Sequence, residues 1–332
     1  MNDSYLTKRI NNKKNILLLS AGRRVELAQS FRLEMNAKSL DGKLYATEMK
    51  PDLSAACQVV DQSFKAPCVS DPSYIDFLLA TCMAAQVGMV VPTIDTELML
   101  LAKNRERFAD NGIHIVISDV DLVNVCSDKR QTAILFEQLD IDIPKIYPRE
   151  NIQFPCFAKP YDGSCSIGAL AIREPQMLSA AVMADEKIIF MELIEDGFDE
   201  YTVDAYFDRF GELRCFVTRQ RLETRAGEVS KGVTRKNHVY DYLLEKLIAL
   251  KGARGCITLQ LFNNAKTKRF AALEINPRFG GGYPLSYSAG AKYPGWLIDE
   301  YLLDRDVPFM DSWESNLMML RYDAKVLVHG SV

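Results

Sequence analysis

Three oxygen-bearing side chains in the last third of the sequence are the best candidates for chemistry: Gln260, Glu274 and Asn276. Residues 257–262 and 269–276 both have the composition of β-strands, and the short polar stretch between them predicts a hairpin turn. If Gln260 pairs with Glu274, period-two alternation puts the three polar side chains on one face. The opposite, apolar face would carry Leu259, Leu261, Leu273 and Ile275.

Carboxylate and amide oxygens suit a hard cation such as Mg²⁺, which commonly completes its coordination shell with water and substrate phosphates. Arg278 follows the second strand, and its permanently charged guanidinium group can bind a phosphate or a carboxylate through two parallel hydrogen bonds. An ordinary edge hairpin with a solvated polar face explains the same pattern. The hairpin alone does not distinguish the two interpretations.

A doubly wound α/β domain is predicted for residues 15–118, because strand-like and helical segments alternate there. Its first strand, residues 15–20, is a continuous apolar run typical of a strand buried on both faces of a parallel sheet. Ligands of such folds bind at the carboxyl ends of strands, here residues 20–23, Glu48 and residues 92–95. A Rossmann oxidoreductase is the weakest alternative, because residues 20–23 hold one glycine of a three-glycine fingerprint.

Two helices are predicted at residues 119–126 and 129–139, before a proline-rich connection. A strand at residues 157–160 then leads into a loop of small residues between Gly163 and Gly168, where backbone N–H groups could wrap an anion. The spacing does not match a Walker A motif, so a plain β-hairpin is the better explanation of this loop taken by itself.

Further strands are predicted at residues 188–194, 200–207 and 216–220, and a helix at residues 239–250. The segment 219–232 is basic and punctuated by glycine. It could be a mobile flap over an anionic substrate or a solvated loop with nothing to bind. The sequence leaves both alternatives open.

Taken together, these motifs resemble the ATP-grasp superfamily, and within it the branch similar to the large chain of carbamoyl phosphate synthetase. The resemblance extends from Asn15 to about Leu303, and its strongest elements are residues 15–27, residues 221–232 and Gln260 with residues 274–278. It implies an α/β protein in which an N-terminal doubly wound parallel-sheet (pre-ATP-grasp) domain is followed by a two-lobed α+β ATP-grasp domain.

The resemblance also implies domain limits. We expect a flexible N-terminus at residues 1–14 and a Rossmann-like pre-ATP-grasp domain at residues 15–118. The ATP-grasp small lobe, with a helical lead-in, would span residues 119–190. The large lobe would span residues 191–310, followed by a C-terminal tail at residues 311–332.

The resemblance assigns nucleotide-binding roles residue by residue. The two lysines would face the ATP phosphates under the glycine loop, the backbone of residues 192–194 would recognise adenine, and Glu200 would hold the ribose hydroxyls. The full expected set is Lys129, Lys159, Gly163, Ser164, Ser166, Gly168, Glu192, Leu193, Ile194 and Glu200.

The metal ligands implied by the resemblance are Gln260, Glu274 and Asn276, with Mg²⁺ as the expected ion and Mn²⁺ as the alternative. Many relatives have a carboxylate at the position of Gln260, but the branch resembling carbamoyl phosphate synthetase has glutamine there. The catalytic groups would be Arg278, Lys159 and Arg225; Arg221 and Lys231 also lie where the family places substrate or phosphate contacts.

The implied reaction is ATP- and Mg²⁺-dependent ligation, in which a small-molecule carboxylate is activated as an acyl phosphate and joined to an amine. Two alternatives remain: a kinase of carboxylates or other small molecules with the same fold, and a non-catalytic nucleotide-binding protein. The sequence identifies neither the substrates nor whether the acceptor is an amine, a thiol or water.

The composition agrees with a cytoplasmic enzyme of small molecules. The net charge of the 332 residues is −4, which argues against a nucleic-acid partner, and no run approaches the roughly 20 apolar residues of a membrane span. The eight cysteines show no repeated spacing, as expected of reduced thiols, and the three scattered histidines argue against a histidine-based site. The oligomeric state stays open, with a homodimer as the candidate.

Overall fold

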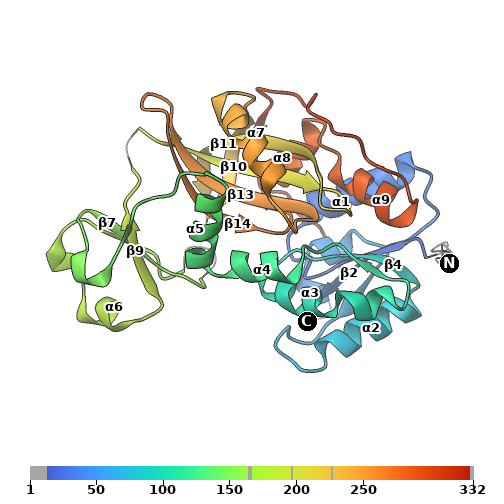
Figure 1. The fold of residues 1–332 in the computed structure, drawn as a ribbon. Helices are drawn as coiled ribbons and strands as arrows, with labels where there is room; N and C mark the ends of the chain where they lie inside the picture. Colours follow the sequence, from blue (N-terminus) through green and yellow to red (C-terminus); the bar gives the residue numbers. More distant parts are fainter. Residues whose placement is uncertain (1–12, 164–166, 196, 226, 330–332) are drawn as a thin grey trace, which may run out of the picture. The chain divides into compact units, whose positions relative to one another are not determined.

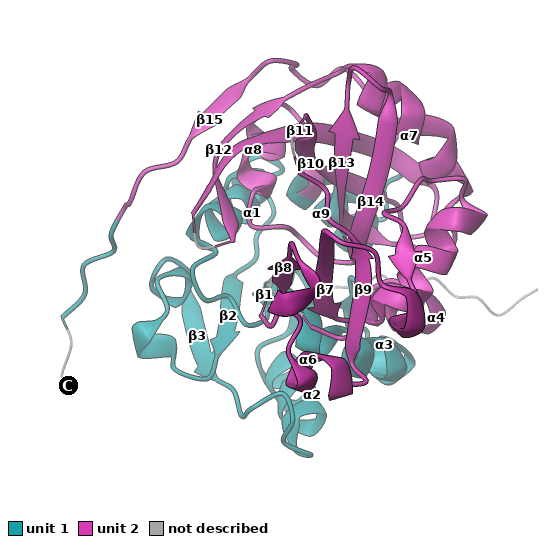
Figure 2. Ribbon diagram, turned by 90° about the vertical axis from the view of Figure 1, so that its left-hand side faces the viewer, with its two compact units in different colours: residues 1–116, 294–307, 325–332 teal, residues 117–293, 308–324 magenta. Residues whose placement is uncertain are grey.

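The structure is a computed structural model that describes residues 13–163, 167–195, 197–225 and 227–329. The chain divides into two compact units (Figure 2). Unit 1 comprises residues 1–116, 294–307 and 325–332, and unit 2 comprises residues 117–293 and 308–324.

Unit 1 contains a five-stranded parallel sheet with the order β3-β2-β1-β4-β5 (Figure 1). The central strands β1 (Asn15–Leu18) and β4 (Val87–Val91) are almost entirely buried, as their continuous apolar sequences predict. The strand order reverses between β1 and β4, which makes the sheet doubly wound. The other strands are β2 (Leu44–Glu48), β3 (Gln62–Lys65) and β5 (His114–Ile115).

The helices of unit 1 alternate with its strands, as predicted for residues 15–118. The α-helices are α1 (Val25–Ala37), α2 (Tyr74–Ala84) and α3 (Asp95–Ala109), with short 3₁₀ turns at η1 (Pro51–Leu53) and η2 (Ala56–Gln58). None of the helices that the structure describes has both the length and the apolar composition needed to traverse a bilayer.

Unit 2 begins with α4 (Val120–Ser127) and α5 (Lys129–Gln138) and continues into an antiparallel four-stranded sheet of order β6-β9-β7-β8. Its strands are β6 (Ile146–Tyr147), β7 (Cys156–Pro160), β8 (Leu170–Ile172) and β9 (Ile188–Glu192), with η3 (Arg149–Asn151), η4 (Pro175–Met177) and α6 (Ala180–Ala184) between them. We call this the small sheet. Its core consists of Cys156, Ala158, Ile172, Ile188 and Phe190.

A six-stranded antiparallel sheet, the large sheet, forms the rest of unit 2 in the order β14-β13-β10-β11-β12-β15 (Figure 1). Its strands are β10 (Asp199–Phe207), β11 (Leu213–Arg225), β12 (Glu228–Thr234), β13 (Gly255–Asn264), β14 (Arg269–Asn276) and β15 (Met318–Leu320). The helices are α7 (His238–Ala249), α8 (Tyr283–Ser288) and α9 (Tyr293–Leu302), which crosses into unit 1.

The predicted hairpin of β13 and β14 is confirmed, and Gln260 lies opposite Glu274 as expected. One prediction about it was wrong. The register shifts between Gln260 and Leu261, so that Leu261 pairs with Ala272 and Leu273 is the extra residue of a bulge. Leu273 is therefore half-buried instead of lying in the core beside Ile275.

The basic segment 219–232 is not a loop, because most of it lies in the long strands β11 and β12. Residues 294–307, expected in the large lobe, are part of unit 1, where Lys38 Nζ lies 2.6 Å from Asp299 Oδ2 and His114 packs against Tyr301. The small sheet includes Glu192, beyond the expected lobe limit at residue 190, and the expected tail contributes β15 to the large sheet.

Candidate functional site

The two faces of the large sheet have different chemistry. On one face, apolar side chains pack against α7, where the rings of Phe216 and Tyr240 stack 4.2 Å apart. On the other face, the strand register aligns polar residues in rows that cross β11, β10, β13 and β14. The members of these rows are Arg221 with Glu200, Arg219 with Thr202, Gln260 and Glu274, and Asp204 with Thr258 and Asn276.

The three residues expected to bind metal lie together on this polar face. Asn276 Nδ2 donates a hydrogen bond of 2.9 Å to Glu274 Oε1, and Gln260 is the cross-strand partner of Glu274. All three are half-buried. Among the described residues there is no cluster of three His, Cys, Asp or Glu side chains, and the expected set would offer one carboxylate and two amide oxygens. Such a set fits a divalent cation that keeps water or phosphate oxygens as its other ligands.

Lys159 on β7 of the small sheet faces this set. The residue is only 9% exposed, and burial lowers the pKa of its ammonium group from 10.5 to about 8. The Glu274 carboxylate opposes that shift and the Lys129 charge adds to it. A desolvated cation held near a carboxylate and a second lysine provides concentrated positive charge for an anionic ligand.

Lys129 is the first residue of α5, and it holds the beginning of the glycine loop. Its backbone N–H donates to the Tyr161 carbonyl at 2.9 Å, and its Nζ donates to the Gly163 carbonyl. Asp128 caps the helix by accepting from Arg130 N at 2.8 Å, and the Arg130 guanidinium lies 3.6 Å from the centre of the Tyr161 ring. These contacts fix one end of the loop to a helix N-terminus.

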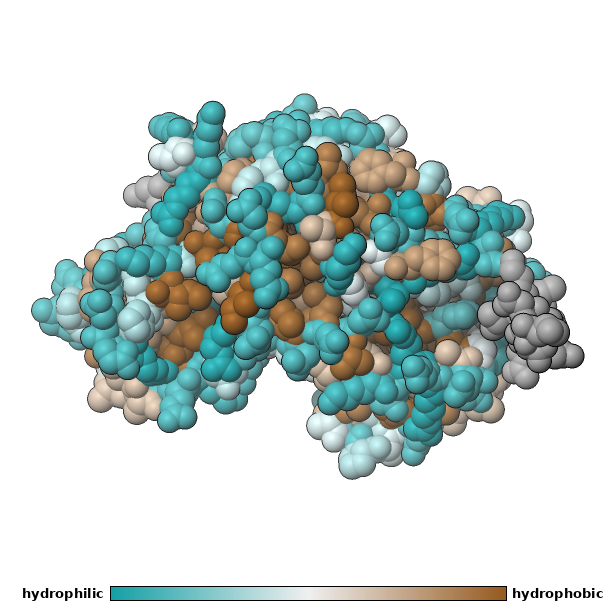
Figure 3. All heavy atoms as spheres, in the orientation of Figure 1, coloured by the Kyte–Doolittle hydropathy of each residue, from teal (hydrophilic) through white to brown (hydrophobic). Residues whose placement is uncertain are grey.

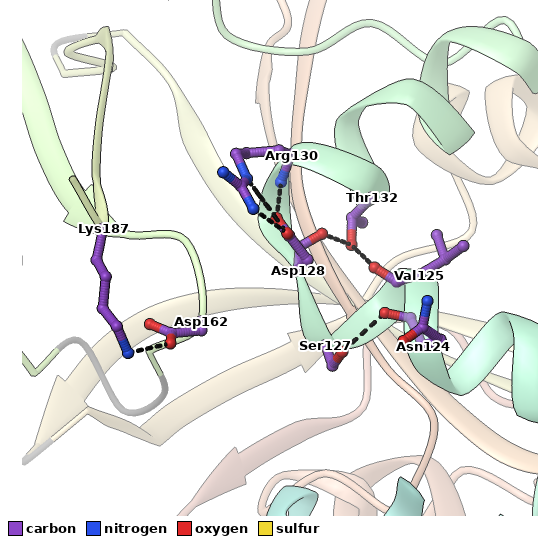
Figure 4. Close-up of polar contacts among 8 residues, drawn as sticks. All are labelled: Asn124, Val125, Ser127, Asp128, Arg130, Thr132, Asp162 and Lys187. Atoms are coloured by element: carbon purple, nitrogen blue, oxygen red, sulfur yellow. Dashed lines mark hydrogen bonds and ion pairs between the residues drawn. The ribbon is translucent and has the colours of Figure 1, made fainter.

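Figure 4 shows this capping arrangement at α5 beside an ion pair of 2.6 Å between Lys187 and Asp162 at the start of the loop. Gly168 has a φ of +74°, a conformation that favours glycine at this position. Ser164 and Ser166, which were expected to bind the nucleotide, lie outside the described residues.

A pocket opens beside the two lysines, between elements of the small sheet, α5 and β14. Figure 3 shows apolar side chains gathered on the visible face over the small sheet and α5. The bulge turns Leu273 toward this pocket, and an apolar lining next to cationic groups suits a flat base attached to phosphates. The lining residues are Lys129, Ala133, Phe136, Ile143, Pro144, Ile146, Lys159, Met191, Ala272 and Leu273.

Sequence reasoning missed the apolar residues of this pocket. They come from four separate segments, and nothing in their spacing distinguishes them from core residues. Pro144 favours an extended conformation for the segment that carries Ile143 and Ile146, but it does not indicate which other elements this segment contacts.

The segment expected to recognise adenine begins at Glu192, whose groups already have partners. Its N–H donates to the Lys145 carbonyl at 2.8 Å, and its carboxylate accepts from Arg269 Nη1 at 2.6 Å. The Arg269 guanidinium lowers the pKa of Glu192. The Glu192 N–H is therefore already bonded within the chain, and the adenine-binding role expected for the backbone of residues 192–194 stays a prediction.

Glu200, expected at the ribose, forms an ion pair with Arg221. Burial raises the pKa of Glu200, the Arg221 charge opposes this shift, and the Glu274 charge adds to it. Arg221 Nε is buried and makes no hydrogen bond to any residue that the structure describes. The pair thus keeps an acidic group on the polar face, near the metal-binding set.

Arg278 lies next to Asn276, one of the three expected metal ligands, but Arg225 does not. Arg278 follows β14, and its N–H donates to the Asn276 carbonyl at 2.8 Å. Arg225 ends β11 at the tip of a hairpin, is 65% exposed, and pairs with Asp323 of the C-terminal segment, which is 79% exposed. Lys231 is likewise exposed and pairs with Glu223.

In unit 1, the residues expected at strand ends form their own network. Gly22 N–H donates to Glu48 Oε2 at 3.1 Å, and Thr93 Oγ1 donates to the Ser20 carbonyl at 2.9 Å. The network also includes Glu97, which was not expected from the sequence and is a fully buried acid that accepts from the Ser20 hydroxyl. Burial raises the pKa of Glu97, and its hydrogen-bond donors oppose the shift. This network holds the end of β1 in place.

Two protein-family models match the chain. Residues 16–116 match the model described as "PylC-like, N-terminal domain", and residues 184–320 match "ATP-grasp in the biosynthetic pathway with Ter operon". A search of curated proteins gave no match.

Solved structures share the fold at low sequence identity. Biotin carboxylase from Campylobacter jejuni is 16% identical, with a TM-score of 0.71, 93% of this chain and 75% of that chain covered. N5-carboxyaminoimidazole synthetase from Staphylococcus aureus, complexed with ADP, is 12% identical, with a TM-score of 0.69 and coverages of 89% and 78%. L-amino acid ligase from Bacillus licheniformis is 15% identical, with a TM-score of 0.65 and coverages of 87% and 74%.

These findings confirm two predictions from the sequence: the ATP-grasp relationship and the fold class, an N-terminal parallel-sheet domain followed by ATP-grasp sheets. The narrower resemblance to the large chain of carbamoyl phosphate synthetase stays a prediction.

Proposed function

We propose that this chain, an ATP-grasp protein with a PylC-like N-terminal domain, is an ATP- and Mg²⁺-dependent ligase that joins a substrate carboxylate to an amine. The observation that carries the proposal is the position of Lys159 opposite Glu274. A buried lysine of the small sheet and a carboxylate of the large sheet interact electrostatically beside an apolar pocket. Phosphoryl transfer from ATP requires this combination of cationic phosphate contacts and metal ligands.

Each side chain has a defined task in this proposal. Lys129 and Lys159 bind the phosphates of ATP, and Glu274 with the Gln260 and Asn276 amides holds Mg²⁺. The ion supplies charge neutralisation for the transferred phosphoryl group. Arg278 follows the metal-binding strand and stabilises negative charge on the same group. Leu193 and Ile194 offer backbone groups to adenine, and Glu200 binds the ribose hydroxyls.

The chemistry needs activation because a carboxylate is a poor electrophile whose leaving group would be oxide. A carboxylate oxygen attacks the γ-phosphorus, the bond to the bridging oxygen breaks, and ADP leaves. The amine nitrogen then attacks the acyl carbon, inorganic phosphate leaves, and the nitrogen loses a proton. Both steps depend on positioning and charge neutralisation, so no side-chain nucleophile is required.

The compared structures support ligation in general terms. Their names include a carboxylase, a synthetase and an amino acid ligase, and one of them was solved with ADP. We therefore propose small molecules as both substrates, with Mn²⁺ as an alternative ion. A cytoplasmic location agrees with the free thiol of every cysteine that the structure describes. A homodimer is the oligomer to test.

The test is to incubate the protein with ATP, Mg²⁺ and pools of carboxylates, with and without pools of amines, and to measure ADP, phosphate and condensed product. Hydroxylamine added in place of the amines should yield hydroxamates, because it attacks acyl phosphates. We expect ADP, phosphate and a condensed product in equal amounts. ADP without any condensed product would support the alternative of a kinase, and tight ATP binding without turnover on any pool would support a non-catalytic protein.

A further inference from the structure

The polar face of the large sheet contains a buried ion pair that the proposed reaction does not use. Asp204 on β10 is 0% exposed and Arg219 on β11 is 1% exposed. Arg219 binds the carboxylate in two-pronged fashion, with Nε 2.7 Å from Oδ2 and Nη2 3.0 Å from Oδ1. Ser286 of α8 also donates to Oδ2 at 2.5 Å, so the pair reaches beyond the sheet.

The chain that follows Arg278 packs its backbone directly against this pair. A Cβ atom at Gly282 would collide with Arg219 Nη1 and lie 2.7 Å from Val229 Cγ1. A Cβ atom at Gly280 would lie 3.0 Å from Thr258 Oγ1. Lack of space, not an unusual backbone conformation, therefore disfavours a side chain at Gly282, and at Gly280 a Cβ atom would press against Thr258. We call residues 280–282 the glycine turn.

Thr258 connects the pair to Arg278. Its hydroxyl donates to the Arg278 carbonyl at 3.0 Å and lies 3.4 Å from Asp204 Oδ1. Since the Arg278 N–H is bonded to the Asn276 carbonyl, both backbone polar groups of Arg278 are fixed by neighbours on the polar face. The position of the Arg278 backbone thus depends on Thr258, and Thr258 rests against Asp204.

Stability alone does not account for the pair. Removing two charges from water costs about as much as their attraction returns, and apolar residues of similar volume often replace a buried ion pair without loss of stability. The pair supplies directed contacts that apolar side chains cannot supply. Its carboxylate and guanidinium groups contact β13, α8 and the glycine turn at the same time.

We propose that Asp204 and Arg219 are positioning residues that hold the Arg278 backbone and the glycine turn in the geometry required for phosphoryl transfer. The inference rests on the proposed function for the task of Arg278. Displacing a catalytic group by about 1 Å can cost about 100-fold in rate. A positioning role therefore predicts a large loss in kcat in a variant whose unfolding midpoint is little changed.

The test compares the double variant Asp204→Leu/Arg219→Met with Arg214→Met. The control removes another arginine of β11, which pairs with Asp208, a buried aspartate in the turn that joins β10 to β11. Three quantities are measured: the midpoint of thermal unfolding, hydrogen exchange of amides 278–286, and the kcat and KM for ATP.

We expect the double variant to fold with a similar unfolding midpoint, to exchange amides 278–286 at least tenfold faster, and to lose about 10- to 100-fold in kcat with an unchanged KM for ATP. Arg214→Met should keep wild-type kcat and exchange. The conservative variant Arg219→Lys, which retains the charge, should recover part of both losses.

A folded double variant with wild-type exchange and kcat would overturn the inference. If the double variant does not fold, Arg219→Lys decides the question, because wild-type exchange in that variant would equally overturn it. The exchange measurement needs no substrate. Faster exchange of amides 278–286 therefore supports the positioning role of the backbone even if no carboxylate proves to be a substrate and the proposed ligase function fails.

Discussion

The β13–β14 and β11–β12 hairpins belong to the same sheet and are both rich in polar residues, yet they differ in what surrounds those residues. The polar side chains of β13–β14 are half-buried and face Lys159 of the small sheet. At the tip of β11–β12, Arg225 and Lys231 form exposed ion pairs. Partial burial against a second element, and not the density of charge in the sequence, distinguishes the candidate site.

The largest expected effect tests the first hairpin. Glu274→Ala should lower the rate of ADP release by about 100- to 1000-fold, because it removes the only carboxylate of the metal-binding set and a partner of the buried Lys159 charge. The matched change in the second hairpin, Glu223→Ala, removes an exposed acid and should keep the rate within about twofold. Equal rates for the two variants would contradict the comparison.

The next effect concerns Lys159, which faces the first hairpin. Its pKa is about 8 in the folded chain against 10.5 for an ordinary lysine, so keeping it charged at pH 7 costs about 3 kcal/mol of folding free energy. Lys159→Met should remove that cost and raise stability at pH 7 while raising the KM for ATP by about tenfold or more. Denaturant unfolding and steady-state kinetics measure the two quantities.

The stability difference between the wild type and Lys159→Met should depend on pH through proton linkage. Between pH 8 and 10.5 the folded chain releases the Lys159 proton before the unfolded chain does, so wild-type stability rises relative to that of the variant. The stability advantage of Lys159→Met should therefore disappear as the pH approaches 10.5. Lys187, an exposed lysine that pairs with Asp162, provides the control: its partner raises the pKa of Lys187, so wild-type stability should not rise relative to that of Lys187→Met between pH 8 and 10.5.

A smaller effect is expected from the ion pair that joins Glu192 of the small sheet to Arg269 of the first hairpin. Glu192→Ala should change the free energy of unfolding by less than about 1 kcal/mol, because the pair is partly exposed, and should raise the KM for ATP severalfold. Arg173→Ala, which breaks an exposed pair with Glu195, should leave the KM unchanged.

The stability effect of Glu192→Ala should depend on pH in the acid range. Arg269 lowers the pKa of Glu192 below its ordinary value of 4.5, so the stabilising contribution is present above pH 4.5 and is lost as the pH falls below that value. The wild type and Glu192→Ala should therefore become equally stable in acid. If the stability difference between the wild type and Glu192→Ala stayed constant as the pH fell below 4.5, the ion pair would not be the cause of that difference.

The smallest effect is expected at the second hairpin. Arg225→Ala should change kcat and KM by less than twofold, because its partner Asp323 is also exposed and a solvated pair contributes little. Arg278→Ala should lower kcat about 100-fold. A loss of tenfold or more in the kcat of Arg225→Ala would support the catalytic role expected from the sequence. It would also contradict the difference drawn between the two hairpins.

The position of Gln260 opposite Glu274 could be predicted from the sequence because strand alternation is a local property. Gln260 and Glu274 are separated by one hairpin, and their pairing follows from the alternation of the two strands. The same alternation gave the wrong position for the neighbouring residue, Leu273. The bulge at Leu273 interrupts the alternation and turns that side chain toward the pocket, and no local pattern announces it.

The exposure of Arg225 and the partner of Arg219 could not be predicted, because charged residues look alike in a sequence whether they are buried or solvated. Arg219 belonged to the same basic segment as Arg225, yet one is 1% exposed and the other 65%. The difference arises because β11 continues to Arg225, past Arg221, which is its last residue paired with β10, so the end of β11 lies beyond the polar face. Such length differences between strands are set by tertiary packing.

The return of residues 294–307 to unit 1 makes unit 2 an insertion within unit 1. During synthesis, the parallel sheet emerges first, but α9 and its contacts with Lys38 and His114 follow only after residues 117–293 have been made. Unit 1 therefore completes its contacts with α9 only after most of unit 2 has been made, although its family-matched segment comes first in the chain. A fragment that stops at residue 116 would lack these contacts, and isolating unit 1 would require a linker that joins residue 116 to residue 294.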